Sequence, residues 1–423
     1  KCGLGYEKTS KESILEHARL LLGKSLWQLY ENARMPQSGK GCLGNAVEKY
    51  HFGYEPNSKS EADFAEAGVE LKCTPLKSLP DGSMVSKERL VLNIIDYMEE
   101  AKATFDTSSF WKKNSLLLLM FYLYEDGKLA FDAIFKIIRL WNFSETDLKI
   151  IRDDWSIIHN KILAGRAHEL SEGDTFYLAA CTKGSKALAE MREQPFSEVK
   201  APQRAYSIKS KFVNSIILDS LNHPEMCHGL FVSNKQKNKI QKIIQDAENA
   251  VRDVSEYQRG ETFEQLVERK FSKYYGKTIS EIETALNKNF RQSKSMAYDV
   301  CRGILGVKAK RIAEFEKAGI AIKTIRLEDN CNLKESMSFP NVNYKSIIEE
   351  ELWEDSMLHE LFTQRFLFVV FRKSKDKNDK LVRLEKVMFW TMPMDDLEQA
   401  KSLWLDTKNK VANDDYEHFV KSS

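Results

Sequence analysis

The chain has few cysteines, and they are not spaced for disulfides or for zinc. The seven cysteines are an odd number and include no Cys-x-x-Cys pair, which argues against a disulfide framework and fits a reducing cytoplasm. Cys227 and His228 lie near His223 in the sequence, but no second ligand cluster with the spacing of a zinc finger follows them. We therefore expect a cytoplasmic protein without structural disulfides or a zinc finger.

The chain also lacks a long apolar run and a phosphate loop. Its longest apolar run, Leu116 to Leu123, is far shorter than the roughly 20 residues of a transmembrane helix. We expect no signal peptide before the first predicted helix, and Gly23-Lys24-Ser25 is not a phosphate loop because position 18 is Ala. At 423 residues and 42% hydrophobic content, the chain is long enough for two domains with full cores.

Global basicity is missing as well. The net charge is only +2, so charge alone does not indicate nucleic acid binding. Positive charge is instead concentrated in two segments, which contain Lys200, Arg204, Lys209 and Lys211, and Lys235, Lys237, Lys239 and Lys242. Such clusters can neutralise phosphates, although without other context a charge run is more often a solvated helix face.

Residues 39–77 hold the most informative pattern, formed by three carboxylates and one lysine: Glu48, Asp63, Glu70 and Lys72. If Val69 to Thr74 is a strand, Glu70 and Lys72 share one face and lie roughly 7 Å apart. Three carboxylates repel one another unless a cation joins them, and a lysine beside them suits a metal-activated water or a phosphate oxygen. The pattern is typical of a metal-dependent phosphodiesterase.

The Glu-x-Lys spacing alone is weak evidence. In a chain that is 30% charged, such a pair usually forms a solvated ion pair on a strand. The surrounding residues strengthen the functional interpretation, because Gly44-x-x-x-Glu48 predicts a helix, residues 58–63 a loop and Ala67-Gly68 the turn that starts the strand.

This string closely resembles the MutH family of nucleases, which includes a nicking endonuclease of mismatch repair and type II restriction endonucleases of the staphylococcal Sau type that cut GATC. The shared elements are Lys40-Gly41, Gly44, Glu48, Ser58-Lys59, Asp63-Phe64 and Gly68-Val69-Glu70-Leu71-Lys72. Residues 86–97, 167–184 and 334–339 also resemble the Sau-type enzyme. The resemblance implies a restriction-endonuclease-like α/β fold, a mixed sheet flanked by helices, duplicated as two domains.

The resemblance further implies a type II site-specific deoxyribonuclease that hydrolyses double-stranded DNA at GATC and leaves 5′ phosphates. Asp63 and Glu70 are hard oxygen ligands suited to Mg²⁺, and Glu48 could hold a second ion or orient a bound water. Lys72 would act on the attacking water and the pentacovalent charge. Lys113, expected at the lip of the next strand, would be the additional active-site lysine of the family.

By the same resemblance, the loop after the expected strand Thr175–Ala180 reads bases in the major groove. The candidates for base reading are Thr182, Lys183, Gly184 and Ser185. Cys181 takes the place of a family arginine. Tyr206 lies where the family has a DNA-contacting tyrosine, although a buried strand aromatic also fits, and Lys209 and Lys211 would contact phosphates and set the register.

Hydrophobic periodicity predicts strands at Ser115–Tyr124, Leu129–Trp141, Thr175–Ala180 and Ala205–Ile208, and helices at Ser10–Leu22, Thr146–Leu163 with Ser144 as cap, and Lys211–Leu221. These elements form a catalytic domain over 1–222. The polar, basic stretch 223–239 is the expected linker, and 240–423 is a second MutH-like domain.

The second half repeats the first. Phe64 to Lys72 aligns with Phe315 to Lys323, a shift of 251 residues (315 minus 64) that also carries Lys113 to Gln364. Asp147-Leu148 with Trp155 aligns with Asp396-Leu397 with Trp404 at a shift of 249 (396 minus 147). A shift held nearly constant over about 90 residues indicates a duplicated domain.

The repeat fails at the catalytic string, where the correspondences are Glu70 with Ala321, Asp63 with Glu314 and Lys72 with Lys323. Because alanine cannot bind a metal ion, the second domain is expected to be catalytically inactive and to serve as a DNA-binding or effector copy. It is also expected to be incomplete, since 66 residues separate Trp155 from Leu221 but only 19 follow Trp404.

A palindromic site such as GATC is normally bound by a protein with two-fold symmetry. A chain with one active site cuts one strand each time it binds. A double-strand break therefore needs two chains that associate on DNA, or two successive binding events. Two alternatives remain. One is a MutH-like nicking repair endonuclease, and the other, from a different class, is a non-catalytic GATC-binding regulatory protein.

Overall fold

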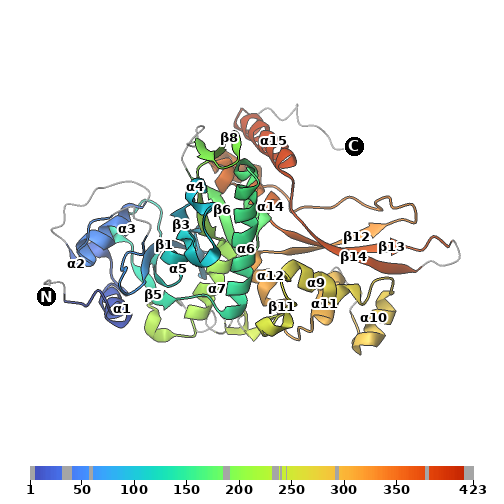
Figure 1. Ribbon diagram of the computed structural model, residues 1–423, viewed down its shortest axis with the longest axis horizontal. Coiled ribbons are helices and arrows are strands. Elements are labelled where there is room, and N and C mark those ends of the chain that lie inside the picture. The colour runs from blue at the N-terminus through green and yellow to red at the C-terminus, as the bar shows by residue number, and fades with distance from the viewer. Residues whose placement is uncertain are drawn as a thin grey trace. The chain divides into compact units, whose positions relative to one another are not determined.

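The computed structural model describes residues 5–30, 41–56, 61–183, 191–230, 238, 241–243, 245–290, 295–376 and 381–413. The chain forms two compact units (Figure 1). The N-terminal unit contains most of the described residues up to Ala247, and the C-terminal unit contains Glu169–Phe176 and the described residues from Glu248 onwards. Each unit combines sheets with flanking helices, as the sequence predicts.

The main sheet of the N-terminal unit has four strands in the order β2-β1-β4-β5. These are β1 (Glu70–Ser78), β2 (Met84–Ser86), β4 (Leu117–Leu123) and β5 (Phe135–Trp141). β1 runs parallel to β4, with Glu70 opposite Leu117, and the other pairs are antiparallel. The predicted mixed sheet is therefore present, and Leu117 to Phe121 are fully buried at its centre.

A second sheet in the same unit has the order β3-β9-β6 and is antiparallel. It consists of β3 (Leu90–Ile94), β6 (Leu178–Thr182) and β9 (Arg204–Ile208). The connection from β6 to β9 carries a hairpin of β7 (Met191–Gln194) and β8 (Ser197–Pro202). The sequence analysis did not predict this hairpin. Most of its side chains are exposed, on both faces of the hairpin, so the sequence lacks the alternation of apolar and polar residues that marks a half-buried strand.

The helices of the N-terminal unit are α1 (Lys11–Arg19), α2 (Leu26–Leu29), α3 (Cys42–Ala46), α4 (Tyr97–Glu100), α5 (Ser109–Asn114), α6 (Glu145–Leu163) and α7 (Ser210–Ser220). A π-helical turn, Val47–His51, directly continues α3. Ser10 and Ser144 cap α1 and α6, since their hydroxyls accept backbone N–H groups of the first turn. The predicted strand from Leu129 is too long, because Ala130–Asp132 forms a 3₁₀ turn that buries Phe131, and β5 begins only at Phe135.

The C-terminal unit contains a three-stranded sheet in the order β12-β13-β14. Its strands are β12 (Ala321–Leu327), β13 (Phe366–Lys373) and β14 (Val382–Trp390). The helices are α9 (Phe263–Ser272), α10 (Ile279–Leu286), α11 (Met296–Leu305), α12 (Ala313–Ala318), α13 (Tyr344–Glu349), α14 (Met357–Phe362) and α15 (Met394–Ala412), and β10 (Ala247–Glu248) pairs with β11 (Arg311–Ile312).

The two units repeat one topology. β12 and β13 are parallel and β13 and β14 antiparallel, as are β1 and β4, and β4 and β5. A helix of 19 residues follows in both units, α6 in the first and α15 in the second. None of the helices among the described residues has the length and apolar character needed to cross a membrane.

Candidate active site

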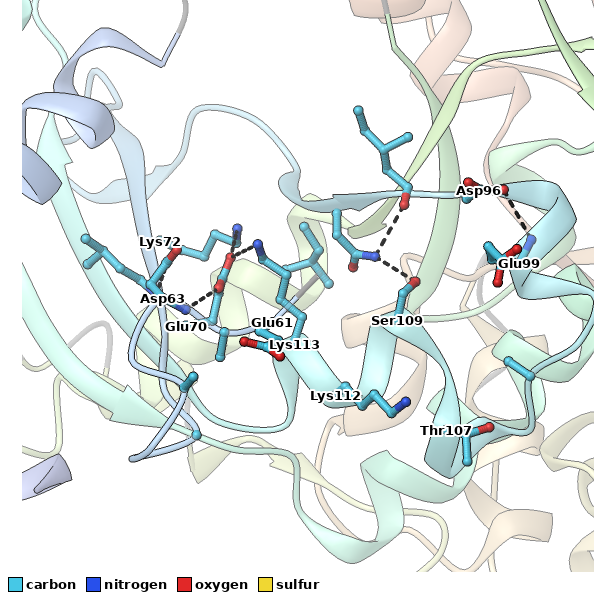
Figure 2. A pocket seen from close by; sticks show the side chains of 18 of the residues that line it. Glu61, Asp63, Glu70, Lys72, Asp96, Glu99, Thr107, Ser109, Lys112 and Lys113 are labelled. Atoms are coloured by element: carbon cyan, nitrogen blue, oxygen red, sulfur yellow. Dashed lines mark hydrogen bonds and ion pairs between the residues drawn. The ribbon is translucent and has the colours of Figure 1, made fainter. Parts of the chain in front are cut away.

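The start of β1 places Glu70 and Lys72 in the wall of a cleft of about 1120 Å³ (Figure 2). Gly68, with φ of +64°, makes the turn before the strand. Val69 and Leu71 are buried in the hydrophobic core beneath the sheet, so Glu70 and Lys72 face the opposite side. The alternation that the sequence predicts is confirmed.

Glu70 is the centre of the cluster. Its Oε1 lies 2.6 Å from Nζ of Lys72 and 3.6 Å from Nζ of Lys113. Its Oε2 accepts the backbone N–H of Asp63 at 3.1 Å. The Glu70 side chain is only 2% exposed, and the two lysine side chains are 17% and 12% exposed. Two ammonium groups therefore converge on one buried carboxylate.

A tight backbone turn brings Asp63 to the same place. Phe64 and Val69 exchange backbone hydrogen bonds of 2.9 and 3.2 Å, which folds the chain back on itself directly after Asp63. Oδ2 of Asp63 then accepts the backbone N–H of Leu71 at 2.9 Å. Asp63 and Glu70 are thus locked to each other through the main chain, which fixes both carboxylates at the start of β1.

Lys113 lies in the last turn of α5 and not at the lip of β4 as predicted. α5 precedes β4 directly, and β4 is the parallel neighbour of β1. From this position the Lys113 side chain points towards Glu70 (Figure 2). The element was predicted wrongly, but the structure does bring the lysine to the cluster.

Glu48 completes the acidic group from the π-helical turn Val47–His51. Burial, and then the charges of Asp63 and Glu70, raise the pKa of Glu48 to about 7 against the opposing effect of Lys72 and Lys113. The pKa of Glu70 is also raised, first by burial. The fold therefore holds negative charge at a cost, which a bound cation would offset.

The donor set of the cleft fits a hard divalent cation. Its wall carries the carboxylates of Glu48, Glu61, Asp63, Glu66, Glu70, Asp96, Glu99 and Glu100, together with Lys72, Lys112 and Lys113. Among the described residues, no three carboxylate, imidazole or thiol groups already lie together as a metal cage. The backbone carbonyl of Glu48 accepts the N–H of Tyr54 at 3.1 Å, whereas its carboxylate oxygens form no hydrogen bond with the described residues. Carboxylate oxygens without thiols or imidazoles suit Mg²⁺.

The predicted base-reading residues begin with Thr182, the last residue of β6, and Lys183 directly follows the strand. Thr182 is exposed and Lys183 half-buried, and the backbone N–H of Lys183 donates to the carbonyl of Gln203 at 2.8 Å. Gly184 and Ser185 lie outside the described residues. The start of the loop is thus tied to the segment between β8 and β9.

Tyr206 is a buried strand aromatic and not a DNA contact. It is fully buried in β9, and its hydroxyl donates to Oε1 of Glu100 at 2.8 Å, so it has no surface to offer a duplex. Arg204, counted with the basic cluster, is also buried and donates to the carbonyl of Ala180 at 2.9 Å. Lys209 is half-buried as the N-cap of α7, and Lys211 is exposed.

Asn93, Glu100 and Ser109 are among the cleft residues that the sequence analysis did not identify. Glu100 is 2% exposed, and its Oε1 accepts the indole N–H of Trp155 at 2.6 Å. Trp404 donates in the same way to Oε2 of Glu350 at 2.6 Å. Glu100 and Glu350 are 250 residues apart (350 minus 100), close to the shift of the sequence repeat. The repeat in the sequence could therefore have identified Glu100 as a position shared by the two copies.

Comparison with known proteins agrees with this geometry. The family model described as DNA mismatch repair enzyme MutH matches residues 52–154 and 305–402. The chain is 36% identical over 422 residues to the type II restriction enzyme Sau3AI of Staphylococcus aureus, which covers 95% of this chain and 80% of Sau3AI. The chain belongs to the MutH family of nucleases. The DNA mismatch repair proteins MutH of Vibrio campbellii and Serratia proteamaculans are each 24% identical over 50% and 49% of this chain, and over 95% and 92% of their own lengths.

The two MutH matches start 253 residues apart (305 minus 52) and end 248 apart (402 minus 154), which supports the duplication. In the second copy, Ala321 stands opposite Phe366 as Glu70 stands opposite Leu117. The Glu314 carboxylate is buried and accepts the backbone N–H groups of Ala250 and Val251 at 2.8 and 3.1 Å. The remaining carboxylate of the MutH pattern is therefore committed to the main chain.

Two further positions of the cluster, those of Glu48 and Lys113, also differ in the second copy. Gly53 and Gly306 each follow a helical segment and have φ of +68° and +77°. Aligning these two glycines gives a shift of 253 residues (306 minus 53), which places buried Cys301 at the position of Glu48. Ser108 and Ser356 cap α5 and α14. Their shift of 248 (356 minus 108) places Leu361, and not Gln364, at the position of Lys113.

Proposed function

We propose that this MutH-family protein is a type II restriction endonuclease that hydrolyses double-stranded DNA at GATC with Mg²⁺ and leaves 5′ phosphates. The observation that carries the proposal is the convergence of Asp63, Lys72 and Lys113 on buried Glu70 in one cleft. The 36% identity to a type II restriction enzyme over 95% of the chain supports restriction as the task.

Asp63 and Glu70 would hold the Mg²⁺ ion, with Glu48 as a further carboxylate. When bound, Mg²⁺ lowers the pKa of a coordinated water and offsets charge on the phosphate oxygens. The raised pKa of Glu48, which follows from burial and then from the charges of Asp63 and Glu70, supports this assignment, since burial and repulsion between carboxylates both favour the binding of a cation.

The chain's own cations would stabilise the charge that develops on the phosphate. Nζ of Lys72 and Nζ of Lys113 both lie near Oε1 of Glu70, so they remain largely buried in the cleft wall. Preorganised ammonium groups in a partly dry cleft stabilise a pentacovalent phosphorane more than water does. Lys72 would also orient the attacking water, and Lys113 would contribute the second positive charge.

DNA reading is proposed for Thr182, the last residue of β6, and for Lys183, Gly184 and Ser185, which follow it in the sequence. Exposed Lys211 and half-buried Lys209 would contact phosphates and set the register. The backbone hydrogen bond from Lys183 to Gln203 supports this assignment, because it gives the reading loop a fixed starting point.

The proposed domains are a catalytic domain over 1–222, a linker over 223–239 and an inactive MutH-like copy over 240–423. The second copy would bind DNA as an effector or complete a pseudo-dimer, and two chains would associate on DNA to break both strands. We place the protein in the bacterial cytoplasm, where restriction enzymes meet DNA.

A plasmid digest tests the function. Parent protein is incubated with a plasmid that has one GATC site, with Mg²⁺ or with EDTA, and the ends are sequenced. Linear product with 5′ phosphates at GATC is expected with Mg²⁺ only. Accumulation of nicked circles alone would favour a nicking repair endonuclease, and binding without any cleavage would favour a regulatory protein. Glu70→Gln is the inactive control.

A second digest tests the effector role. Plasmids with one and with two GATC sites are compared at equal site concentration. Faster cleavage of the two-site plasmid is expected if the inactive copy or a second chain engages another site. Equal rates at all enzyme concentrations would contradict both the effector role and self-association.

A further inference from the structure

Asn93 ties β3 to both ends of the helix that carries Lys113. Its Nδ2 donates to the hydroxyl of Ser109, the first residue of α5, at 3.1 Å. Its Oδ1 accepts Nδ2 of Asn114, the last residue of α5, at 2.8 Å. The bond that reaches Ser109 is visible in Figure 2. One amide side chain therefore clamps the whole helix.

The clamp is continued into the core. The Ser109 hydroxyl donates to Oε2 of Glu100 at 3.3 Å, and Oε1 of Glu100 is held by Trp155 and Tyr206 at 2.6 and 2.8 Å. Glu100 is buried and so are both of these partners. The N-terminal end of α5 is thus fixed against α6 and β9, while Asn93 fixes it against β3.

α5 needs such support because it has only six residues. A helix of this length is not stable by itself. Lys113 lies one residue before Asn114, and its Nζ reaches to 3.6 Å from Oε1 of Glu70. A small rotation of α5 would therefore displace the ammonium from Glu70, and misplacement of a catalytic group by about 1 Å can reduce a rate by about 100-fold.

The second copy provides an internal comparison. Asp96 and Asn343 cap α4 and α13, and their shift of 247 (343 minus 96) places Pro340 at the position of Asn93. The shift of 248 from the caps of α5 and α14 places Met357 and Phe362 at the positions of Ser109 and Asn114. All three clamp residues are replaced by residues whose side chains cannot form these bonds.

The second copy lacks both the clamp residues and a counterpart of Lys113. Both copies keep the hydrogen bond from tryptophan to glutamate, Trp155 to Glu100 in the first and Trp404 to Glu350 in the second. The tryptophan bond therefore serves the shared fold. The clamp is present only in the copy that has Lys113, with Leu361 at the equivalent position in the other.

We propose that Asn93 is a positioning residue that holds α5 so that Lys113 meets Glu70 in the cleft. The inference rests on the proposed nuclease function. Asn93 acts through Lys113 and does not itself contact the reacting phosphate, so its loss should matter only while Lys113 is present.

A double-mutant cycle tests the proposal. Single-turnover cleavage at saturating DNA is measured for the parent, Asn93→Ala, Lys113→Ala and the double variant, and DNA affinity is measured with Ca²⁺ in place of Mg²⁺. Asn93→Ala should slow cleavage by about 10- to 100-fold in the parent and by less than about twofold in Lys113→Ala. DNA affinity should stay within about twofold, because no DNA contact is lost. Ser109→Ala should behave like Asn93→Ala, and Ser109→Thr should keep the parent rate.

Asn214→Ala is the matched control, because Asn214 accepts the backbone N–H of Ser86 at 2.7 Å and makes a cross-link remote from Lys113. It should lower thermal stability without changing the rate. Equal slowing by Asn93→Ala with and without Lys113 would overturn the proposal, and so would weaker DNA binding at an unchanged rate. A parent that binds but never cleaves DNA would instead refute the nuclease function, and this role with it.

Discussion

Glu70 and Ala321 occupy the same register position in the two sheets. Each is the first residue of its strand, and β1 runs parallel to β4 as β12 does to β13, with Glu70 opposite Leu117 and Ala321 opposite Phe366. Because the strand pairing is the same, the carboxylate of Glu70 is the side-chain difference at this register position. The chain therefore contains its own comparison between the site proposed to hold a cation and a copy that lacks this carboxylate.

Glu70→Ala converts the first site to the state of the second. Loss of this carboxylate removes a metal ligand and the partner of both Lys72 and Lys113, so cleavage should fall by at least about 10³-fold. The fold should persist, because the second copy forms the same strand with alanine. Plasmid cleavage and circular dichroism check both expectations, and Glu125→Ala, an exposed pair with Lys128, is the control. Cleavage at the parent rate would refute the assignment of Glu70.

The reverse change should not create a second centre. In the Glu70→Ala background, Ala321→Glu restores one carboxylate, but Cys301 and Leu361 still stand where Glu48 and Lys113 are needed, and Glu314 is bound to the main chain. The double variant should remain without measurable cleavage. Plasmid linearisation by the double variant would show that the second copy needs only this one substitution.

Local patterns predicted the parts of the site that depend on nearby residues. The alternation along β1 placed Glu70 and Lys72 on one face, and Ser144 marked the start of α6. The repeat shift identified Ala321 at the position of Glu70. Each of these rests on spacing within a strand or helix, or on direct comparison of two stretches of sequence.

Features that depend on distant residues were not predicted. α5 is short and apolar at Phe110 and Trp111, so periodicity gave no helix there. The hydroxyl of buried Tyr206 donates to Glu100, which is 106 residues away in the sequence. The clamp at Asn93 joins residues 16 and 21 positions apart through side-chain amides, for which neither helical nor strand periodicity has a signal.

Glu48→Gln should stabilise the metal-free protein at high pH. The pKa of Glu48 is raised from 4.5 to about 7 by burial and by the charges of Asp63 and Glu70. Between pH 4.5 and 7 the folded state therefore keeps a proton on Glu48 that the unfolded state loses. The contribution of Glu48 to the free energy of unfolding is full below pH 4.5 and is lost as the pH rises through 7. Glutamine does not ionise and avoids this loss.

In EDTA, the unfolding midpoint of Glu48→Gln should exceed that of the parent by about 1–3 °C at pH 8, and by much less at pH 5. Added Mg²⁺ should reduce or reverse the difference, because it binds the parent ligand set more tightly. Differential scanning calorimetry measures the midpoints. The same gain at both pH values would mean that ionisation of Glu48 is not the cause.

His51 should make the N-terminal unit sensitive to acid. Burial, and then the charge of His17, lower its pKa from 6.5 to about 4. Its Nε2 donates to the carbonyl of His17 at 2.9 Å and its Nδ1 accepts the hydroxyl of Tyr30 at 2.9 Å, so both ring nitrogens are used by the neutral form.

Above pH 6.5 the imidazole is neutral in both states, and between 6.5 and 4 the unfolded state takes up a proton that the folded state excludes. Stability from His51 is therefore present above pH 6.5 and lost as the pH falls to 4, by roughly 3 kcal/mol in total. Urea unfolding at pH 7, 5.5 and 4.5 should show a steeper decline for the parent than for His51→Gln. The variant should be less stable at pH 7 by about 1–2 kcal/mol, because the hydrogen bonds of the imidazole are weakened. Parallel declines would assign the acid sensitivity to other groups.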